Sequence, residues 1–210
     1  ARVMASMPTR RSVASAAMHT QVRKVIAALA LGAGALSGCG DDGESAPAAA
    51  DTDDIGTIEG VVAVEVTSAR HVSGTVDYAT SPPAGGDHNG AWQNCGFYTV
   101  PLVPEHVVHS LEHGAVWITY TPDAGDAALE TIERLTDEHD FVLASPYPGN
   151  PAPFVLTAWG RQLELDSIDD ARVGQFLDLY LENGPTTPEP GAPCSGAVGV
   201  PPEQPTTLAR

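Results

Sequence analysis

The chain has 210 residues, with 10 basic and 27 acidic side chains and a formal net charge of −17 at pH 7. So acidic a protein has no electrostatic reason to bind nucleic acid or anionic lipid headgroups, and we expect no nucleic-acid partner. The length suits one folded domain with additional terminal segments. The sequence identifies no protein partner.

The first 38 residues have the features of a secretory signal peptide. They contain no acidic residue, and an apolar run from Val25 to Leu36 follows the basic pair Arg23 and Lys24. A basic start, a short apolar run and small residues before the cleavage point define such a signal. The run has roughly a dozen residues, fewer than the about 20 that span a bilayer. We interpret residues 1–38 as a signal peptide, with Met18 as the natural start.

The tetrapeptide Leu36-Ser-Gly-Cys39 resembles the bacterial lipobox, in which the cysteine is lipidated and becomes the new N-terminus. The alternative is an ordinary signal peptide with a chance cysteine. An acidic stretch rich in Ala, Asp and Gly follows, so residues 39–56 are predicted to be the lipidated cysteine and a flexible linker. We therefore expect an extracytoplasmic protein that is held to a bacterial membrane by a lipid on Cys39.

Hydrophobic periodicity predicts alternating strands and helices in the folded part. Pro104 suits the first turn of a helix and Gly114 its C-terminal end, so a helix is predicted between them. The other predicted strands are 58–66, 72–78, 115–120, 141–144, 154–158 and 161–165, and the other predicted helices are 126–138 and 173–181.

The order of these elements indicates an α+β or α/β fold. We predict a single compact two-layer sandwich, a mixed sheet with two to three helices packed on it. The folded domain is predicted at 57–182, and the Pro- and Gly-rich residues 183–210 are predicted to be an extended tail.

Two cysteines remain after Cys39. In an oxidising compartment Cys95 and Cys194 are expected to pair as a disulfide. The competing interpretation makes the Cys95 thiolate a metal ligand and leaves Cys194 incidental.

Histidine is concentrated in one region, with five of the seven between positions 71 and 113. In a helix, His109 and His113 lie one turn apart on a shared face, an arrangement that presents nitrogen ligands to Zn or Cu. His88 lies on an upstream loop. We predict a Cu or Zn site formed by these three histidines, with Cys95 or Glu112 completing or supporting the ligand set.

Two alternatives remain open. The first is a structural or protein-interaction module, in which the same His and Glu side chains form a buried hydrogen-bond network. The second, more remote, is a zinc hydrolase, because residues 109–113 match His-x-x-Glu-His, with Glu112 as the base that activates water. That scheme needs a carboxylate ligand on a second helix, whereas Glu189 lies in the Pro-rich tail. The sequence therefore favours a non-enzymatic protein.

Several longer motifs resemble an uncharacterised bacterial lipoprotein family, catalogued as domain of unknown function number 3105. The motifs are His71-Val-x-Gly-Thr-Val-x-Tyr78, Pro82-Pro83-x-Gly85-Gly86-x-His88, Trp92-Gln-Asn-Cys95-Gly96-x-Tyr98, Glu105-x-Val-Val-His109-Ser-Leu-Glu112-His113-Gly114-Ala-Val-Trp117, Ser145-Pro-Tyr-Pro148, Ala158-Trp-Gly-Arg161 and Pro190-Gly-Ala-Pro-Cys194. The resemblance covers roughly residues 60–195. It implies an exported or membrane-attached protein and supplies no activity, substrate or cofactor.

Overall fold

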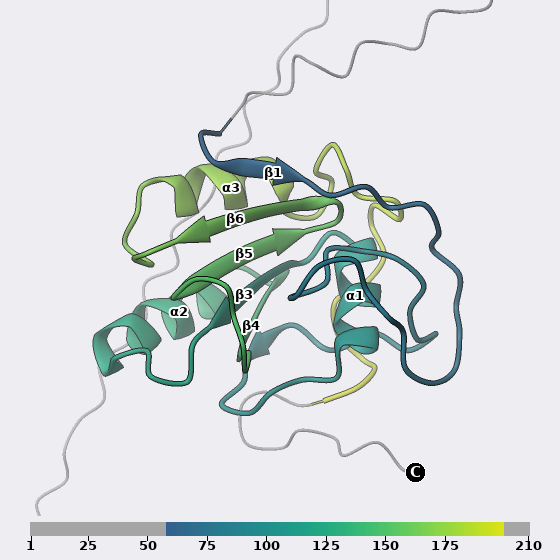
Figure 1. Ribbon diagram of the computed structural model, residues 1–210, viewed down its shortest axis with the longest axis horizontal. Coiled ribbons are helices and arrows are strands. Elements are labelled where there is room, and N and C mark those ends of the chain that lie inside the picture. Colours follow the sequence, from purple (N-terminus) through teal and green to yellow (C-terminus); the bar gives the residue numbers. More distant parts are fainter. Residues whose placement is uncertain (1–57, 200–210) are drawn as a thin grey trace, which may run out of the picture. The chain divides into compact units, whose positions relative to one another are not determined.

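A six-stranded mixed sheet forms the centre of the structure, a computed structural model that describes residues 58–199 (Figure 1). The strand order is β1-β6-β5-β3-β4-β2. The predicted signal peptide, lipidated Cys39 and linker lie outside the described residues, as does the end of the predicted tail.

The sheet combines a parallel and an antiparallel half. The parallel half contains β2 (Gly96–Phe97), β3 (Val116–Tyr120) and β4 (Val142–Pro146). A crossover helix, α2 (Asp126–Glu138), connects β3 to β4, as parallel neighbours require. The antiparallel half adds the hairpin of β5 (Phe154–Ala158) and β6 (Arg161–Leu165), with β1 (Val61–Ala63) at its edge.

Side chains alternate between the two faces of the central strand β3 and divide the core in two. Val116 and Ile118 belong to one cluster, together with apolar side chains of α2 and of α3 (Arg172–Tyr180). Trp117 points the other way, into a second cluster with α1 (Pro104–Glu112). α2 packs against β2 and β4 and α3 against β5, and Figure 1 shows α1 apart from both. The predicted mixed sheet in a two-layer α/β arrangement with three helices is confirmed.

The two N-terminal strand predictions are corrected. The predicted strand 58–66 shortens to Val61–Ala63. The predicted strand 72–78 is irregular, and the isolated bridge between His71 and His88 lies just before it. β-branched residues favour a strand only where a partner strand is available. Here the chain leaves the sheet after β1 and runs past α1, so its backbone finds no continuous ladder.

The chain after α3 returns to α1. The Glu189 backbone N–H donates to the Glu112 carbonyl oxygen at 3.1 Å, and Val198 forms an isolated bridge with Gln93. Between them Cys194 forms a disulfide with Cys95. In Figure 1, α1 therefore lies between the blue-to-teal segment that precedes it and the yellow segment near the C-terminus. Within residues 58–199, no helix is long and apolar enough to cross a membrane.

Gly114 fixes the end of α1 and the start of the sheet. It has φ +95°, and its carbonyl oxygen accepts a hydrogen bond of 2.8 Å from the Glu182 N–H. A Cβ at this position would lie 2.0 Å from the Glu182 carbonyl oxygen, far inside van der Waals contact distance. We expect Gly114→Ala to destabilise the fold by about 3 kcal/mol, from the left-handed backbone and the steric overlap together. Urea unfolding followed by circular dichroism measures the loss.

Gly174 supplies the matched control. It is exposed on α3, and a Cβ there would meet no atom within 4 Å. Gly174→Ala is expected to raise stability by up to about 1 kcal/mol, the ordinary helix-propensity gain. Equal effects of the two substitutions would contradict the role given to Gly114.

Candidate metal centre

The helix α1 is buried on its polar as well as its apolar side. Val107, Val108 and Leu111 pack into the second core cluster. The remaining buried side chains of the helix and its C-cap are polar, and none is more than 5% exposed: Glu105, His106, His109, Ser110, Glu112 and His113. Buried polar groups require partners, so the surroundings of these side chains are expected to be specific.

Backbone carbonyl oxygens set the orientation of the imidazole rings. The Nδ1 atoms of His88, His109 and His113 lie 2.8, 2.7 and 2.7 Å from the carbonyl oxygens of Gly86, Asn89 and Pro193, and His106 Nδ1 contacts that of Ala91. A nitrogen that faces a carbonyl oxygen must carry the proton. In a neutral ring the other nitrogen, Nε2, then keeps its lone pair. Metal-binding histidines are usually oriented in this way.

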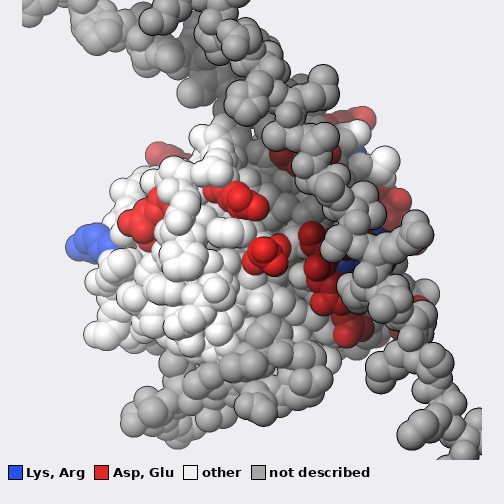
Figure 2. All heavy atoms as spheres, turned by 180° about the vertical axis from the view of Figure 1, so that it is seen from behind, with Lys and Arg blue, Asp and Glu red and all other residues white. Residues whose placement is uncertain are grey.

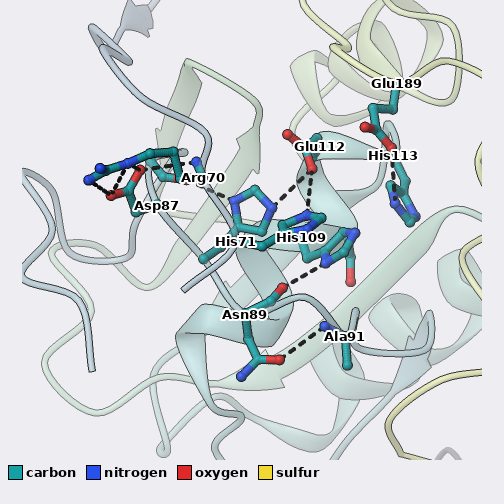
Figure 3. A network of polar contacts seen from close by, with 12 residues as sticks. Arg70, His71, Asp87, Asn89, Ala91, His109, Glu112, His113 and Glu189 are labelled. Carbon is teal, nitrogen blue, oxygen red and sulfur yellow. Dashed lines mark hydrogen bonds and ion pairs between the residues drawn. The ribbon is translucent and has the colours of Figure 1, made fainter. Parts of the chain in front are cut away.

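Four side chains converge in front of α1. His71, His88, His109 and Glu112 each place one ligand atom within 4.8 Å of the other three. His71 and His88 come from the irregular segment between β1 and β2, where the isolated bridge pairs them, and the other two come from α1. Figure 3 shows the His71 ring turned toward the Glu112 carboxylate, with His109 beside it. Three imidazole nitrogens and one carboxylate oxygen match the ligand types of zinc sites.

The centre of this cluster contains unpaired polar atoms. His88 Nε2 and Glu112 Oε2 lie 2.9 Å apart, yet neither has a hydrogen-bond partner among the described residues, so the close contact lacks hydrogen-bond alignment. Both residues are buried, at 0% and 5% exposure. A buried polar atom without a partner costs roughly 1–3 kcal/mol. A cation between the two atoms would remove that cost for both.

His109 is held neutral. Burial lowers its pKa to about 4, the hydrogen bond to Asn89 opposes the shift, and the neighbouring rings of His113, His88 and His71 add to it. At neutral pH this imidazole is therefore unprotonated, the form that coordinates a metal.

Of the five residues predicted as ligands, three lie in the cluster: His88, His109 and Glu112. His113 lies outside it. Its ring packs against that of His109, with centroids 4.5 Å apart, but its Nε2 faces Glu189 at 3.7 Å. His71 was not predicted as a ligand. The available signal was its position at the start of the first family-like motif, one of several segments that carry the histidines.

Of the two roles predicted for Cys95, the structure has the disulfide. Cys95 and Cys194 are joined with Cα atoms 5.4 Å apart, and the backbone adds a 2.7 Å hydrogen bond between them. A sulfur in a disulfide is not a thiolate, so Cys95 provides no metal ligand in this state. Disulfides are typical of proteins in oxidising, extracytoplasmic compartments.

The geometry also bears on the His-x-x-Glu-His motif. In a zinc hydrolase of that type His109 and His113 would be the ligands, with Glu112 nearby as a base. Here Glu112 lies within the cluster, 2.9 Å from His88 and 3.7 Å from His71, whereas His113 is turned to Glu189. The carboxylate of Glu112 is thus one of the four groups that could hold an ion, and His113 is not.

Comparison with known proteins gives a family and no function. The family model described as "Protein of unknown function (DUF3105)" matches residues 71–196, which include the whole cluster and both cysteines of the disulfide. No curated protein and no solved structure matches the chain.

Proposed function

The chain belongs to the DUF3105 family, and we propose that it is an extracytoplasmic domain that binds one divalent transition-metal ion, Zn(II) or Cu(II), at His71, His88, His109 and Glu112. The observation that carries the proposal is the convergence of these ligand atoms around two buried polar atoms without partners. The hydrogen bonds among the described residues leave those two atoms unpaired.

The ligand types favour a divalent ion of intermediate softness. Imidazole suits Zn and Cu, whereas Cu(I) is selected by thiolate and thioether sulfur, which this cluster lacks among its four members. The overall charge of the protein favours cations as well. Figure 2 shows acidic side chains outnumbering basic ones on the face it presents, and the whole chain has a net charge of −17. A negative surface raises the local concentration of cations.

Metal analysis tests the proposal directly. The protein is produced by export to an oxidising compartment without a histidine tag, incubated with Zn(II) or Cu(II), desalted and analysed by plasma mass spectrometry. We expect about one equivalent of metal in the wild-type protein. The double variant His88→Ala/His109→Ala, which removes two buried ligands, is expected to retain none above background.

His113→Ala is the matched control, because His113 is also buried and adjacent to His109 but lies outside the cluster. It should retain the metal. Loss of metal in His113→Ala equal to that in the double variant would show that the ligand set is wrong. Absence of metal in the wild-type protein would refute the proposal.

The second candidate function is a structural or protein-interaction module. The contacts of His106 Nδ1 with the Ala91 carbonyl oxygen and of His109 Nδ1 with that of Asn89 favour it, since they fix the irregular segment 89–91 against α1 whether or not a metal binds. In that case the His88–Glu112 contact is a buried ion pair, and the metal analysis finds no specific binding.

We also propose that the domain is attached to a bacterial membrane through a lipid on Cys39. The lipobox-like Leu36-Ser-Gly-Cys39 and the preceding basic and apolar segments support this attachment. The disulfide supports the same extracytoplasmic location.

A further inference from the structure

The four proposed ligands differ in exposure. His88, His109 and Glu112 are 0%, 3% and 5% exposed and form the buried part of the site. The His71 side chain is 53% exposed, and its Nε2 lies 3.7 Å from Glu112 Oε2, compared with 2.9 Å for His88. His71 therefore forms the solvent-facing side of the site, and it is the one proposed ligand that solvent reaches readily.

The backbone alone holds His71 weakly. It lies in the irregular segment between β1 and β2. Two backbone hydrogen bonds tie its neighbours Arg70 and Val72 to His88. The His88 N–H donates to the Arg70 carbonyl oxygen at 3.0 Å, and the Val72 N–H donates to the His88 carbonyl oxygen at 2.7 Å. A bridge of this length has little independent stability.

A carboxylate reinforces the bridge beside both histidines. Asp87 precedes His88 in the chain, and its Oδ2 lies 2.7 Å from the Arg70 guanidinium, while Arg70 precedes His71. Asp87 Oδ1 also accepts a 3.0 Å hydrogen bond from the Arg70 backbone N–H and one from the Ser68 hydroxyl. Figure 3 shows the Arg70–Asp87 pair on the side of His71 away from His113.

We infer that Asp87 is a positioning residue that holds His71 over the buried ligands, so that the Arg70–Asp87 pair sets how fast a bound metal ion is released. The inference rests on the proposed metal site. If His71 moves away from Glu112, residues 68–72 move with it. The contacts of Asp87 with Ser68 and Arg70 then break. Groups that orient a metal ligand typically change metal affinity by about 10–100-fold when they are removed.

The test is the rate at which Zn(II) leaves the loaded protein for excess EDTA, measured by stopped flow with a colorimetric zinc indicator. In Asp87→Ala we expect release about 10-fold faster than in wild type, with one Zn(II) still bound at saturation. Arg70→Ala is expected to act in the same direction with a smaller effect, because the backbone and Ser68 contacts to Asp87 remain. Arg70 is 77% exposed, so this variant tests the inference even where Asp87→Ala does not fold.

Asp170→Ala is the matched control. Asp170 makes the same kind of pair with Arg172, also at 2.7 Å, at the start of α3 on the other face of the sheet. This variant should release Zn(II) at the wild-type rate.

A double-mutant cycle separates positioning of His71 from general loosening of the loops. Asp87→Ala should accelerate release in the wild-type background and have no further effect in the His71→Ala background. Equal acceleration in both backgrounds, or wild-type release rates in Asp87→Ala and Arg70→Ala, would overturn the inference while leaving the metal site intact. A wild-type protein that binds no Zn(II) overturns the metal site and the inference together.

Discussion

Zn(II) at one hundred times its Kd is expected to raise the stability of the wild-type domain by about 2.7 kcal/mol. For a domain of this size the corresponding increase in Tm is about 10 °C. The physical reason is that the ligands converge only in the folded chain, since His71, His88 and α1 are brought together by tertiary contacts. Calorimetry or circular dichroism with and without Zn(II) measures the shift.

His88→Ala should abolish this shift. The substitution also leaves a cavity in the buried site and lowers stability without metal, so each variant is compared with itself in the presence and absence of Zn(II). His139→Ala removes a histidine at the C-cap of α2, outside the cluster, and should keep the full increase in Tm. A shift in His88→Ala as large as in wild type would mean that zinc stabilises the protein somewhere else.

Loss of the disulfide is expected to cost about 4 kcal/mol of unfolding free energy. Cys95 and Cys194 are 99 residues apart, and in the chain-entropy model a closed loop of about 100 residues contributes roughly 4.7 kcal/mol. Urea unfolding of the double variant Cys95→Ala/Cys194→Ala, compared with the oxidised wild type, measures the difference.

Reduced wild type is the control for the two alanine substitutions. It should unfold at nearly the same urea concentration as the double variant, since both lack the cross-link. A loss below about 1 kcal/mol would mean that the backbone hydrogen bonds of Cys95, Asn94 and Val198 hold the C-terminal segment without the disulfide. Because Cys95 is not a member of the His/Glu cluster, metal binding by the folded fraction should persist.

Local sequence patterns predicted those helices and strands whose apolar periodicity and flanking turns lie close together in the sequence. The helix 126–138 and the strands 154–158 and 161–165 have the predicted bounds. In each of them apolar periodicity and the flanking turn agree, and the element packs against sheet or helix neighbours. The prediction of a strand at 72–78 was wrong. β-branched residues only favour an extended backbone, and a strand also needs a neighbouring strand in register.

The ligand set was only partly predictable for a related reason. The pair at i and i+4, His109 and His113, was expected to bind together because the two side chains share a helix face. In the structure the Pro193 carbonyl oxygen, next to the disulfide, holds the His113 ring, and the pair that α1 contributes to the His/Glu cluster is His109 and Glu112. The two residues of that contact are 80 positions apart, so the spacing of residues within the helix cannot predict it. His71 likewise reaches the site through a bridge to His88 that strand patterns do not predict.

The two outermost strands of the sheet are short, and this affects how the protein behaves in crowded surroundings. β1 has three residues and β2 has two, while the four strands between them have five each. A long outer strand offers a row of unpaired backbone groups on which another chain can add a strand and start aggregation. Here the length of backbone open to such addition is small at both sides of the sheet. Even at high local concentration, the sheets of neighbouring molecules should therefore pair poorly through their edge strands.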